Sequence, residues 1–189
     1  MKLIKQNWWD KFFMDDKHCL PVQRYEKKFI ADIRKNSRVL DLGCGEGWLG
    51  KVVVENKLSY VGIDSSLYAL GRVSITLAKY PKISLLNYDL ENLPSGLEAD
   101  VILLRFVLAH IKNKNRFIKT VSKILKPGGQ LYILTPTRTG GKYPTKYRSI
   151  SILDSELKGL LLGFKVKPLK IRRYPKYQMS LGAYVCQKI

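Results

Sequence analysis

The chain has few cysteines and no long apolar run. Its 189 residues include only Cys19, Cys44 and Cys186, which are scattered and show no C-x-x-C spacing. Such a set argues against a disulfide framework and against a structural zinc site. No apolar stretch approaches the roughly 18 residues of a transmembrane helix, and the N-terminus lacks the apolar segment of a signal peptide. We therefore expect a soluble, cytoplasmic protein.

Acidic residues are also scarce. Lysine and arginine total 34 against 15 aspartates and glutamates, which gives a net charge of +19. The excess is uneven, because residues 138–189 hold 12 basic and 2 acidic residues, a net charge of +10. A charge of this size attracts polyanions such as RNA, DNA or an anionic membrane. A lysine-rich, solvated surface without a partner has the same composition, so both interpretations stay open.

The apolar pattern predicts helices and strands along one domain, for which a hydrophobic content of 46% is sufficient. An aromatic helix capped by Asn7 and a second helix over residues 22–34 precede the first strand. Later strands are expected at 59–64, 83–89 and 130–136, and residues 99–111 are expected to form a fourth strand that runs into a short helix, with helices between the strands. A last helix at 154–162 leads to a hairpin of residues 164–173 and 179–188. A basic loop at 137–150 is either a substrate contact or a crossover.

The most informative stretch is V-L-D-L-G-C-G-E-G, residues 39–47. Apolar residues recur at helical spacing after it, so it predicts a buried strand, a glycine turn and the start of a helix. Glycines permit positive φ and a close approach to a ligand, and a helix N-terminus offers free N–H groups. A nucleotide-like ligand is the first hypothesis. The alternative is an ordinary strand–turn–helix without a ligand, although three glycines would then weaken the helix start without benefit.

A dinucleotide fingerprint fits this stretch poorly. Residues 45–50 match G-x-G-x-x-G, which is a weak signal alone, and counting from Gly43 places Trp48 at the third glycine position. Asp41 at the strand end would repel a pyrophosphate but would favour a cationic ligand. The stretch instead resembles the first motif of the class I S-adenosylmethionine-dependent methyltransferases, apolar-apolar-Asp/Glu-x-Gly-x-Gly-x-Gly. Asp41, Gly43, Gly45 and Gly47 fill that motif without a gap.

Three later segments extend this resemblance. Asp64 ends a short apolar strand 23 positions beyond Asp41, where an acid accepts the ribose hydroxyls. Asp89 and Leu90 are similar to the family's D-x-x-x-L-P segment, which contacts the adenine, and L-K-P-G-G at 125–129 is similar to its turn before the fifth strand. The resemblance implies this set of cofactor-binding residues: Asp41, Gly43, Cys44, Gly45, Gly47, Asp64, Ser65, Asp89, Leu90 and Arg105.

Two residues near the fourth strand are candidates for catalysis. His110 stands in a V-L-x-H-I pattern found in many small-molecule members of the family. A neutral imidazole with a pKa of about 6.5 suits proton removal from an acceptor, although in many relatives this histidine is structural. Arg105 would either reach the acceptor as a fixed charge or close a surface ion pair.

Several motifs of related enzymes are missing. The sequence has no Asn/Asp-Pro-Pro-Tyr/Phe segment and no Cys beside Pro near the fourth or sixth strand, which argues against base-amino and cytosine-C5 methylation. Without clustered His and Asp residues, no metal is expected. A direct in-line methyl transfer remains, in which the protein mainly positions the reactants.

The resemblance implies an α/β, Rossmann-like, doubly wound sheet of seven strands in the order 3-2-1-4-5-7-6, with strand 7 antiparallel. Residues 1–36 would form an N-terminal helical cover and residues 37–189 the methyltransferase domain. The expected function is transfer of a methyl group from S-adenosyl-L-methionine to an O, N or C nucleophile of a small-molecule acceptor, leaving S-adenosyl-L-homocysteine. The alternatives are an RNA or nucleotide methyltransferase that uses the basic C-terminal quarter, and a non-catalytic binding protein of the same fold.

Overall fold

The computed structural model describes residues 8–14, 21–139, 150–174 and 179–189. The chain forms two compact units, Met1–Leu93 and Pro94–Ile189. The expected Asn7 cap and nearly all of the basic loop at 137–150 lie outside the described residues. Among those that are described, no helix is long and apolar enough to cross a membrane.

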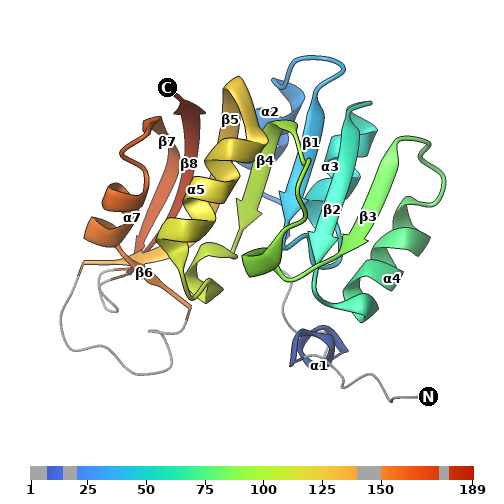
Figure 1. The fold of residues 1–189 in the computed structure, drawn as a ribbon, viewed down its shortest axis with the longest axis horizontal. Coiled ribbons are helices and arrows are strands. Elements are labelled where there is room, and N and C mark those ends of the chain that lie inside the picture. The colour runs from blue at the N-terminus through green and yellow to red at the C-terminus, as the bar shows by residue number, and fades with distance from the viewer. Residues whose placement is uncertain (1–7, 15–20, 140–149, 175–178) are drawn as a thin grey trace. The chain divides into compact units, whose positions relative to one another are not determined.

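The first unit is a parallel three-stranded sheet with its connecting helices (Figure 1). Strands β1 (Arg38–Leu42), β2 (Ser59–Asp64) and β3 (Ile83–Asn87) lie in the order β3-β2-β1. Helices α3 (Trp48–Glu55) and α4 (Leu67–Leu77) join them, and α2 (Arg24–Ala31) packs against α3. Helix α1 (Trp8–Met14) comes before these elements, and the 3-10 turn η1 (Leu90–Asn92) follows β3.

The core of this unit explains why its strands read as continuous apolar runs. Strands of a parallel sheet that are covered on both faces carry few polar side chains. Val39, Leu42 and Ile63 on β1 and β2 are fully buried, as are Val53 on α3 and Val73 on α4. This packing holds the carboxyl ends of the strands in register, with Leu42 opposite Ile63 and Asp64 opposite Asn87.

The second unit is a mixed sheet in the order β4-β5-β8-β7. Strand β4 (Ala99–Arg105) leads through the 3-10 turn η2 (Leu108–His110) to helix α5 (Lys114–Ile124) and the long strand β5 (Leu125–Arg138). A two-residue strand β6 (Ile152–Leu153) pairs with β5 and continues into helix α7 (Asp154–Leu160). Strands β7 (Phe164–Tyr174) and β8 (Met179–Lys188) form the closing hairpin, and β8 is antiparallel to both neighbours.

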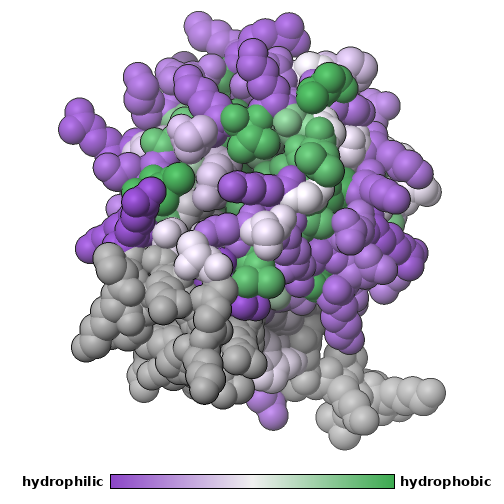
Figure 2. Space-filling model, turned by 90° about the vertical axis from the view of Figure 1, so that its left-hand side faces the viewer, coloured by the Kyte–Doolittle hydropathy of each residue, from purple (hydrophilic) through white to green (hydrophobic). Residues whose placement is uncertain are grey.

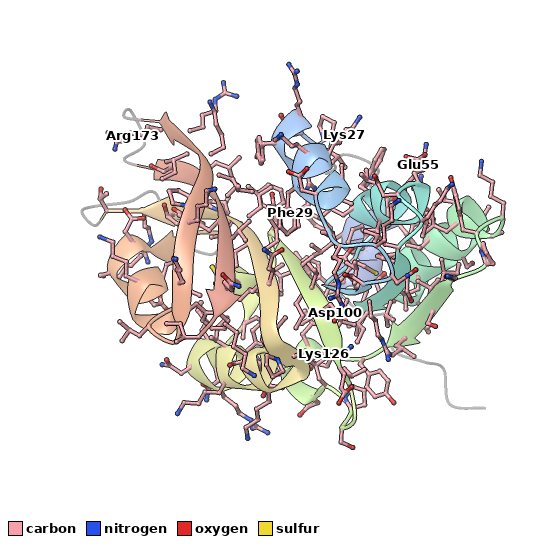
Figure 3. The ribbon with its side chains drawn as sticks, turned by 90° about the horizontal axis from the view of Figure 1, so that it is seen from above. Lys27, Phe29, Glu55, Asp100, Lys126 and Arg173 are labelled. Atoms are coloured by element: carbon pink, nitrogen blue, oxygen red, sulfur yellow. The ribbon has the colours of Figure 1, made fainter. Side chains whose placement is uncertain are left out.

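Two lysines fasten the elements of this unit to one another. The Lys188 ammonium on β8 donates to the carbonyls of Ser122 (2.7 Å) and Leu125 (2.9 Å) at the end of α5, which have no intrahelical partner of their own. Lys126 at the start of β5 pairs with Asp100 on β4 at 3.3 Å (Figure 3). The C-terminal strand is therefore anchored to the last turn of α5.

The predicted strand order was 3-2-1-4-5-7-6. The first unit contains its first part, β3-β2-β1, and the second unit contains the remainder, β4-β5-β8-β7. Strand β6 was missed, so the predicted strands 6 and 7 are β7 and β8, and the antiparallel strand is the one expected. Gly128 has φ of 72°, as predicted for the glycine turn at residues 125–129, although β5 already begins at Leu125 and not at residue 130. Among the apolar residues of α4 and α3, Leu67 and Trp48 are 51% and 47% exposed. Each is the first residue of its helix, so its side chain lies at the helix end and not on the buried face.

Candidate cofactor-binding site

The glycine turn that follows β1 is fastened to the end of β2. Gly43, Gly45 and Gly47 all have positive φ, of 75°, 50° and 73°. The N–H groups of Gly43 and Cys44 donate to the Ile63 carbonyl at 2.7 and 3.1 Å. A Cβ on Gly47 would lie 2.9 Å from Cγ1 of Val73, so a side chain there would be strained by both φ and contact. The turn thus requires glycine and presents mainly backbone.

Asp64, at the end of β2, is held against this turn. Its Oδ2 accepts the Gly45 N–H at 2.9 Å, and its Oδ1 accepts the Ser66 N–H at 2.9 Å. Burial raises the pKa of this carboxyl; the N–H groups of Ser66, Gly45 and Ser65 lower it by less, and the nearby charge of Asp10 raises it further. Because a carboxylate offers about four acceptor positions, Asp64 keeps capacity for a ligand hydroxyl.

Asp41 lies beneath the turn, where it is 2% exposed. Its Oδ2 accepts a hydrogen bond of 3.0 Å from the hydroxyl of Tyr60, a fully buried residue of β2. Burial, followed by the charge of Asp41, raises the pKa of Tyr60, so the phenol stays protonated and donates. Burial likewise raises the pKa of the Cys44 thiol, with contributions from Asp41 and Asp64. Cys44 is therefore a neutral, buried thiol.

Helix α1 contacts both the turn and the start of α4. Oδ1 of Asp10 accepts hydrogen bonds from the Ser66 hydroxyl (2.6 Å) and the Tyr68 N–H (3.1 Å). Ser66 is itself the N-cap of α4 and accepts the Ala69 N–H at 3.0 Å. Cζ of Phe13 lies 3.0 Å from the position that a Cβ on Gly45 would occupy, so its ring rests on the turn.

The third strand of the first unit ends beside Asp64. The Tyr88 N–H and the Asn87 side-chain amide both donate to the Asp64 carbonyl, at 3.1 and 3.0 Å. Asp89 follows as an exposed residue that caps η1, since its Oδ1 accepts the Glu91 N–H at 3.0 Å. Leu90 is half-buried. The structure thus shows Asp89 capping the turn η1.

Arg105 and His110 belong to the second unit. Arg105 ends β4, and its guanidinium carbon lies 5.0 Å from the centre of the Phe106 ring. Phe106 has φ of 60°, a conformation that a bulky side chain rarely adopts. His110 is exposed at the end of η2; partial burial of its ring and, secondly, the charge of Lys114 lower its pKa below 6.5.

The structure brings together seven of the nine residues expected in the first unit: Asp41, Gly43, Cys44, Gly45, Gly47, Asp64 and Ser65. The other two, Asp89 and Leu90, lie at the start of η1. Sequence reasoning missed the contacts that Asp10, Phe13, Tyr60 and Asn87 make with this set. For Tyr60 the available signal was a tyrosine in an apolar strand, two residues before Gly62. The aromatic helix that carries Asp10 and Phe13 was expected, but their contacts were not, because both residues are far from their partners in sequence. Within the described residues, no group of three or more His, Cys, Asp or Glu side chains is arranged to hold a metal ion.

Comparison with known proteins identifies the family. A family model described as a methyltransferase domain matches residues 13–165, most of the chain. The chain belongs to the class I S-adenosylmethionine-dependent methyltransferases. This methyltransferase is 29% identical over 180 residues to the ubiquinone biosynthesis O-methyltransferase of Pelagibacter ubique (strain HTCC1062), with 81% of the chain and 73% of that protein covered.

Other relatives are matched over less of their length. The ubiquinone biosynthesis O-methyltransferase of Agrobacterium fabrum is 34% identical over 123 residues, which cover 63% of the chain and 46% of that protein. The methyltransferase chain thus spans about half the length of that relative. Among solved structures, TehB from Haemophilus influenzae superposes with a TM-score of 0.73 over 96% of the chain and 67% of TehB, at 18% identity. At that identity the likeness shows the fold alone, and it confirms the predicted Rossmann-like class.

The residues of the first unit suit S-adenosylmethionine. A turn in which every second residue is glycine admits a ligand against its backbone, and a Cβ at Gly47 would disrupt that conformation. Asp64 supplies acceptors that suit hydroxyl groups, and Asp41 supplies a second acid at the end of the neighbouring strand. Both acids oppose an anionic ligand and favour a ligand that carries positive charge.

Proposed function

We propose that the chain transfers a methyl group from S-adenosylmethionine to a nucleophile of a small-molecule acceptor, an oxygen in preference to nitrogen or carbon. The observation that carries the proposal is the arrangement of Asp64, which is bound by the Gly45 and Ser66 amides at the edge of the glycine turn. The preference for a small molecule and for oxygen is supported by relatives named ubiquinone biosynthesis O-methyltransferases.

In this proposal each part of the site has one task. Asp64 accepts hydrogen bonds from the ribose hydroxyls, and Ser65 follows it in the loop that leads to α4. Asp89 and Leu90 lie beside the adenine. The glycines, Cys44 and Asp41 form the floor under the amino-acid end, and Arg105 is included among the cofactor-binding residues on the strength of the sequence resemblance. The cofactor supplies an electrophilic methyl group on a sulfonium. Residues 1–36 act as a helical cover, which is supported by the contacts of Asp10 and Phe13 with Ser66 and Gly45.

His110 is the proposed general base. Its lowered pKa keeps the imidazole neutral at pH 7, the form that accepts a proton from an acceptor hydroxyl. No metal is required for this role, because an in-line transfer depends mainly on positioning and on the exclusion of water. The neutral Cys44 thiol takes no covalent part.

Calorimetric titration with S-adenosylmethionine and S-adenosylhomocysteine tests the proposal. We expect micromolar binding of both ligands, followed by methyl transfer to a small-molecule acceptor that carries a hydroxyl group. Binding without turnover of any acceptor would favour the non-catalytic alternative. Absence of binding would contradict the assignment of the glycine turn.

An Asp64→Asn variant tests the main contact. The amide retains only one acceptor oxygen and turns an NH2 group toward N–H donors, so we expect at least a tenfold rise in the Kd of S-adenosylhomocysteine, about 1.4 kcal/mol. Asp32→Asn, at the exposed C-cap of α2, is the matched control and should leave the Kd unchanged. Equal affinity of Asp64→Asn and wild type would remove Asp64 from the site.

A second candidate, an RNA or nucleotide acceptor, is favoured by the charge of β7. Its exposed side chains include five basic residues, Lys165, Lys167, Lys170, Arg172 and Arg173, with exposed Val166 and Ile171 between them. Figure 2 faces this side of the second unit and shows mainly hydrophilic side chains with separate apolar groups. Arg173 lies at the outer end of the strand (Figure 3). A charged edge strand that resists pairing with other chains has the same appearance.

Salt dependence separates the two acceptor classes. Contacts with phosphates release counterions, so RNA binding would fall steeply between about 50 and 200 mM salt. We expect instead that binding of short single-stranded RNA is weak at both concentrations and does not change the Kd of the cofactor. Tight, salt-sensitive binding that is coupled to the cofactor would make RNA the acceptor.

A further inference from the structure

The side chain of Tyr60 occupies a space that two glycines keep open. A Cβ on Gly50 of α3 would lie 2.5 Å from Cζ and 2.7 Å from the hydroxyl oxygen of Tyr60. A Cβ on Gly62 of β2 would lie 3.0 Å from the same oxygen and 3.0 Å from Sγ of Cys44. Two elements therefore lack a side chain beside the Tyr60 hydroxyl, which donates to Asp41.

This hydroxyl links the segments that build the turn. Tyr60 lies on β2, Asp41 near the end of β1 and Cys44 within the turn itself. On the side of β2 the turn is held by the Gly43 and Cys44 N–H groups, which donate to the Ile63 carbonyl, and by the Gly45 N–H, which donates to Asp64. The phenol adds a side-chain hydrogen bond to Asp41, at the end of the strand that leads into the turn.

Simple core packing does not account for this arrangement. A phenylalanine would fill the same ring volume without placing a polar group in the interior, and an unpaired hydroxyl there is unfavourable. The Asp41 carboxylate is just as buried, and a buried charge requires hydrogen-bond donors. The hydroxyl and the carboxylate therefore satisfy each other, and losing either one leaves a polar atom beneath the turn without that partner.

We propose that Tyr60 is a positioning residue: its hydroxyl fixes Asp41, and through Asp41 holds the glycine turn in the conformation that receives the cofactor. The proposal rests on the proposed function for the identity of the ligand, but not for the rigidity of the turn. It assigns to Gly50 and Gly62 the role of leaving room for the phenol.

The test compares Tyr60→Phe with a matched control, Tyr132→Phe. Tyr132 lies on β5 of the second unit and is 1% exposed, so both variants remove one hydroxyl from a buried tyrosine. Two quantities are measured in each full-length protein. Amide hydrogen exchange of residues 43–47 is followed without ligand, and the Kd of S-adenosylhomocysteine is measured by calorimetry; the melting temperature reports the fold.

We expect Tyr60→Phe to speed exchange at Gly43 and Cys44 by at least tenfold and to raise the Kd by about tenfold, which corresponds to 1.4 kcal/mol. Tyr132→Phe should leave both quantities within twofold of wild type at a similar loss of melting temperature. In an Asp41→Ala background, Tyr60→Phe should add little, because both substitutions remove the same hydrogen bond.

Unchanged exchange in Tyr60→Phe, or the same change in Tyr132→Phe, overturns the proposal. Additive effects of Tyr60→Phe and Asp41→Ala also overturn it, since Tyr60 would then act independently of Asp41. If wild type itself fails to bind S-adenosylhomocysteine, the proposed function is wrong, and the exchange comparison still decides the role of Tyr60.

Discussion

Burial determines the protonation of the side chains around the glycine turn. Desolvation is the largest contribution to the raised pKa of Asp64, Tyr60 and Cys44. Tyr60 and Cys44 are therefore neutral near pH 7, and the charge at this end of the sheet belongs to carboxylates that are surrounded by N–H and O–H donors. Such an environment favours a ligand that brings its own positive charge and its own hydroxyl groups.

The lowered pKa of His110 leads to a prediction about pH. A base with a lowered pKa loses its proton at a lower pH than usual, so the acidic limb of kcat should lie below pH 6.5. His110→Gln should abolish that limb and lower kcat by about 10²–10⁴-fold.

Lys114→Gln tests whether the charge of Lys114 contributes to the lowered pKa of His110. It removes the second contribution to the lowered pKa, so the limb should move toward higher pH while partial burial keeps it below 6.5. Lys114 also pairs with Glu156 at 3.6 Å, so the melting temperature must be followed alongside. An identical limb in wild type and His110→Gln would show that another group is the base.

Single residues differ in how far the sequence could predict them. Asp41 and the glycines lie in one continuous motif, and Asp64 ends the next strand, so parallel pairing of β1 and β2 brings them together. Asp10 and Tyr60 could not be predicted in the same way. Their partners, Ser66 and Asp41, are 56 and 19 residues away, and the contacts depend on side-chain direction.

At the scale of elements, Asp10 couples α1 to α4. Asp10→Ala removes the acceptor of two hydrogen bonds at the start of α4, which we expect to cost about 1 kcal/mol in the free energy of unfolding. Because Phe13 on the same helix covers Gly45, we also expect S-adenosylhomocysteine to dissociate several-fold faster.

Lys11→Ala is the matched control for this helix, since Lys11 is exposed. It should change neither the denaturant midpoint nor the dissociation rate, which competition against labelled ligand can measure. Equal dissociation rates for Asp10→Ala and Lys11→Ala would show that the coupling of α1 to α4 does not govern release of the ligand.

Two glycines of the second unit allow a paired test of backbone conformation. Neither Gly128 nor Gly159 has any atom within 4 Å of an added Cβ, but only Gly128 has positive φ. Gly128→Ala should therefore destabilise by about 1–2 kcal/mol, whereas Gly159→Ala, inside α7, should stabilise by about 0.5–1 kcal/mol. Chemical denaturation measures the free energy of unfolding of both variants. Effects of the same sign would contradict the assignment of a glycine turn at residues 125–129.

Elements were predictable from the sequence where their pattern was long. The hairpin of β7 and β8 was predicted within one residue at every end, because apolar positions and turn signals agree over ten residues or more. Strand β6 has only two residues, Ile152 and Leu153, and exists because Thr137 and Arg138 of β5 offer it pairing partners. A strand that depends on such a distant partner leaves no periodic signal.

For the whole molecule, net charge is the property most open to experiment. Replacing Lys165, Lys167 and Lys170 by Ser removes three of the positive charges of β7. If this strand binds a single-stranded polyanion, the slope of log K against log salt should fall by about 0.7 for each lost phosphate contact.

The control variant removes the same number of positive charges from the first unit, by replacing Lys27, Lys28 and Lys35 with Ser. All three lysines are exposed, and Figure 3 shows Lys27 on α2. The proposed small-molecule function predicts weak RNA binding by wild type and the same change in both variants. A larger loss in the β7 variant would locate a polyanion site on that strand.

The positions of the tryptophans have a practical consequence. The chain has three, Trp8, Trp9 and Trp48. The first two belong to the aromatic cluster of α1, and the third directly follows Gly47, with its indole N–H 3.4 Å from the Glu46 carboxylate. Tryptophan fluorescence of this protein therefore arises from residues beside the glycine turn and in α1. A ligand that binds at the glycine turn should therefore change the tryptophan emission. The second unit contains no tryptophan, so a change confined to it should leave that emission unaltered.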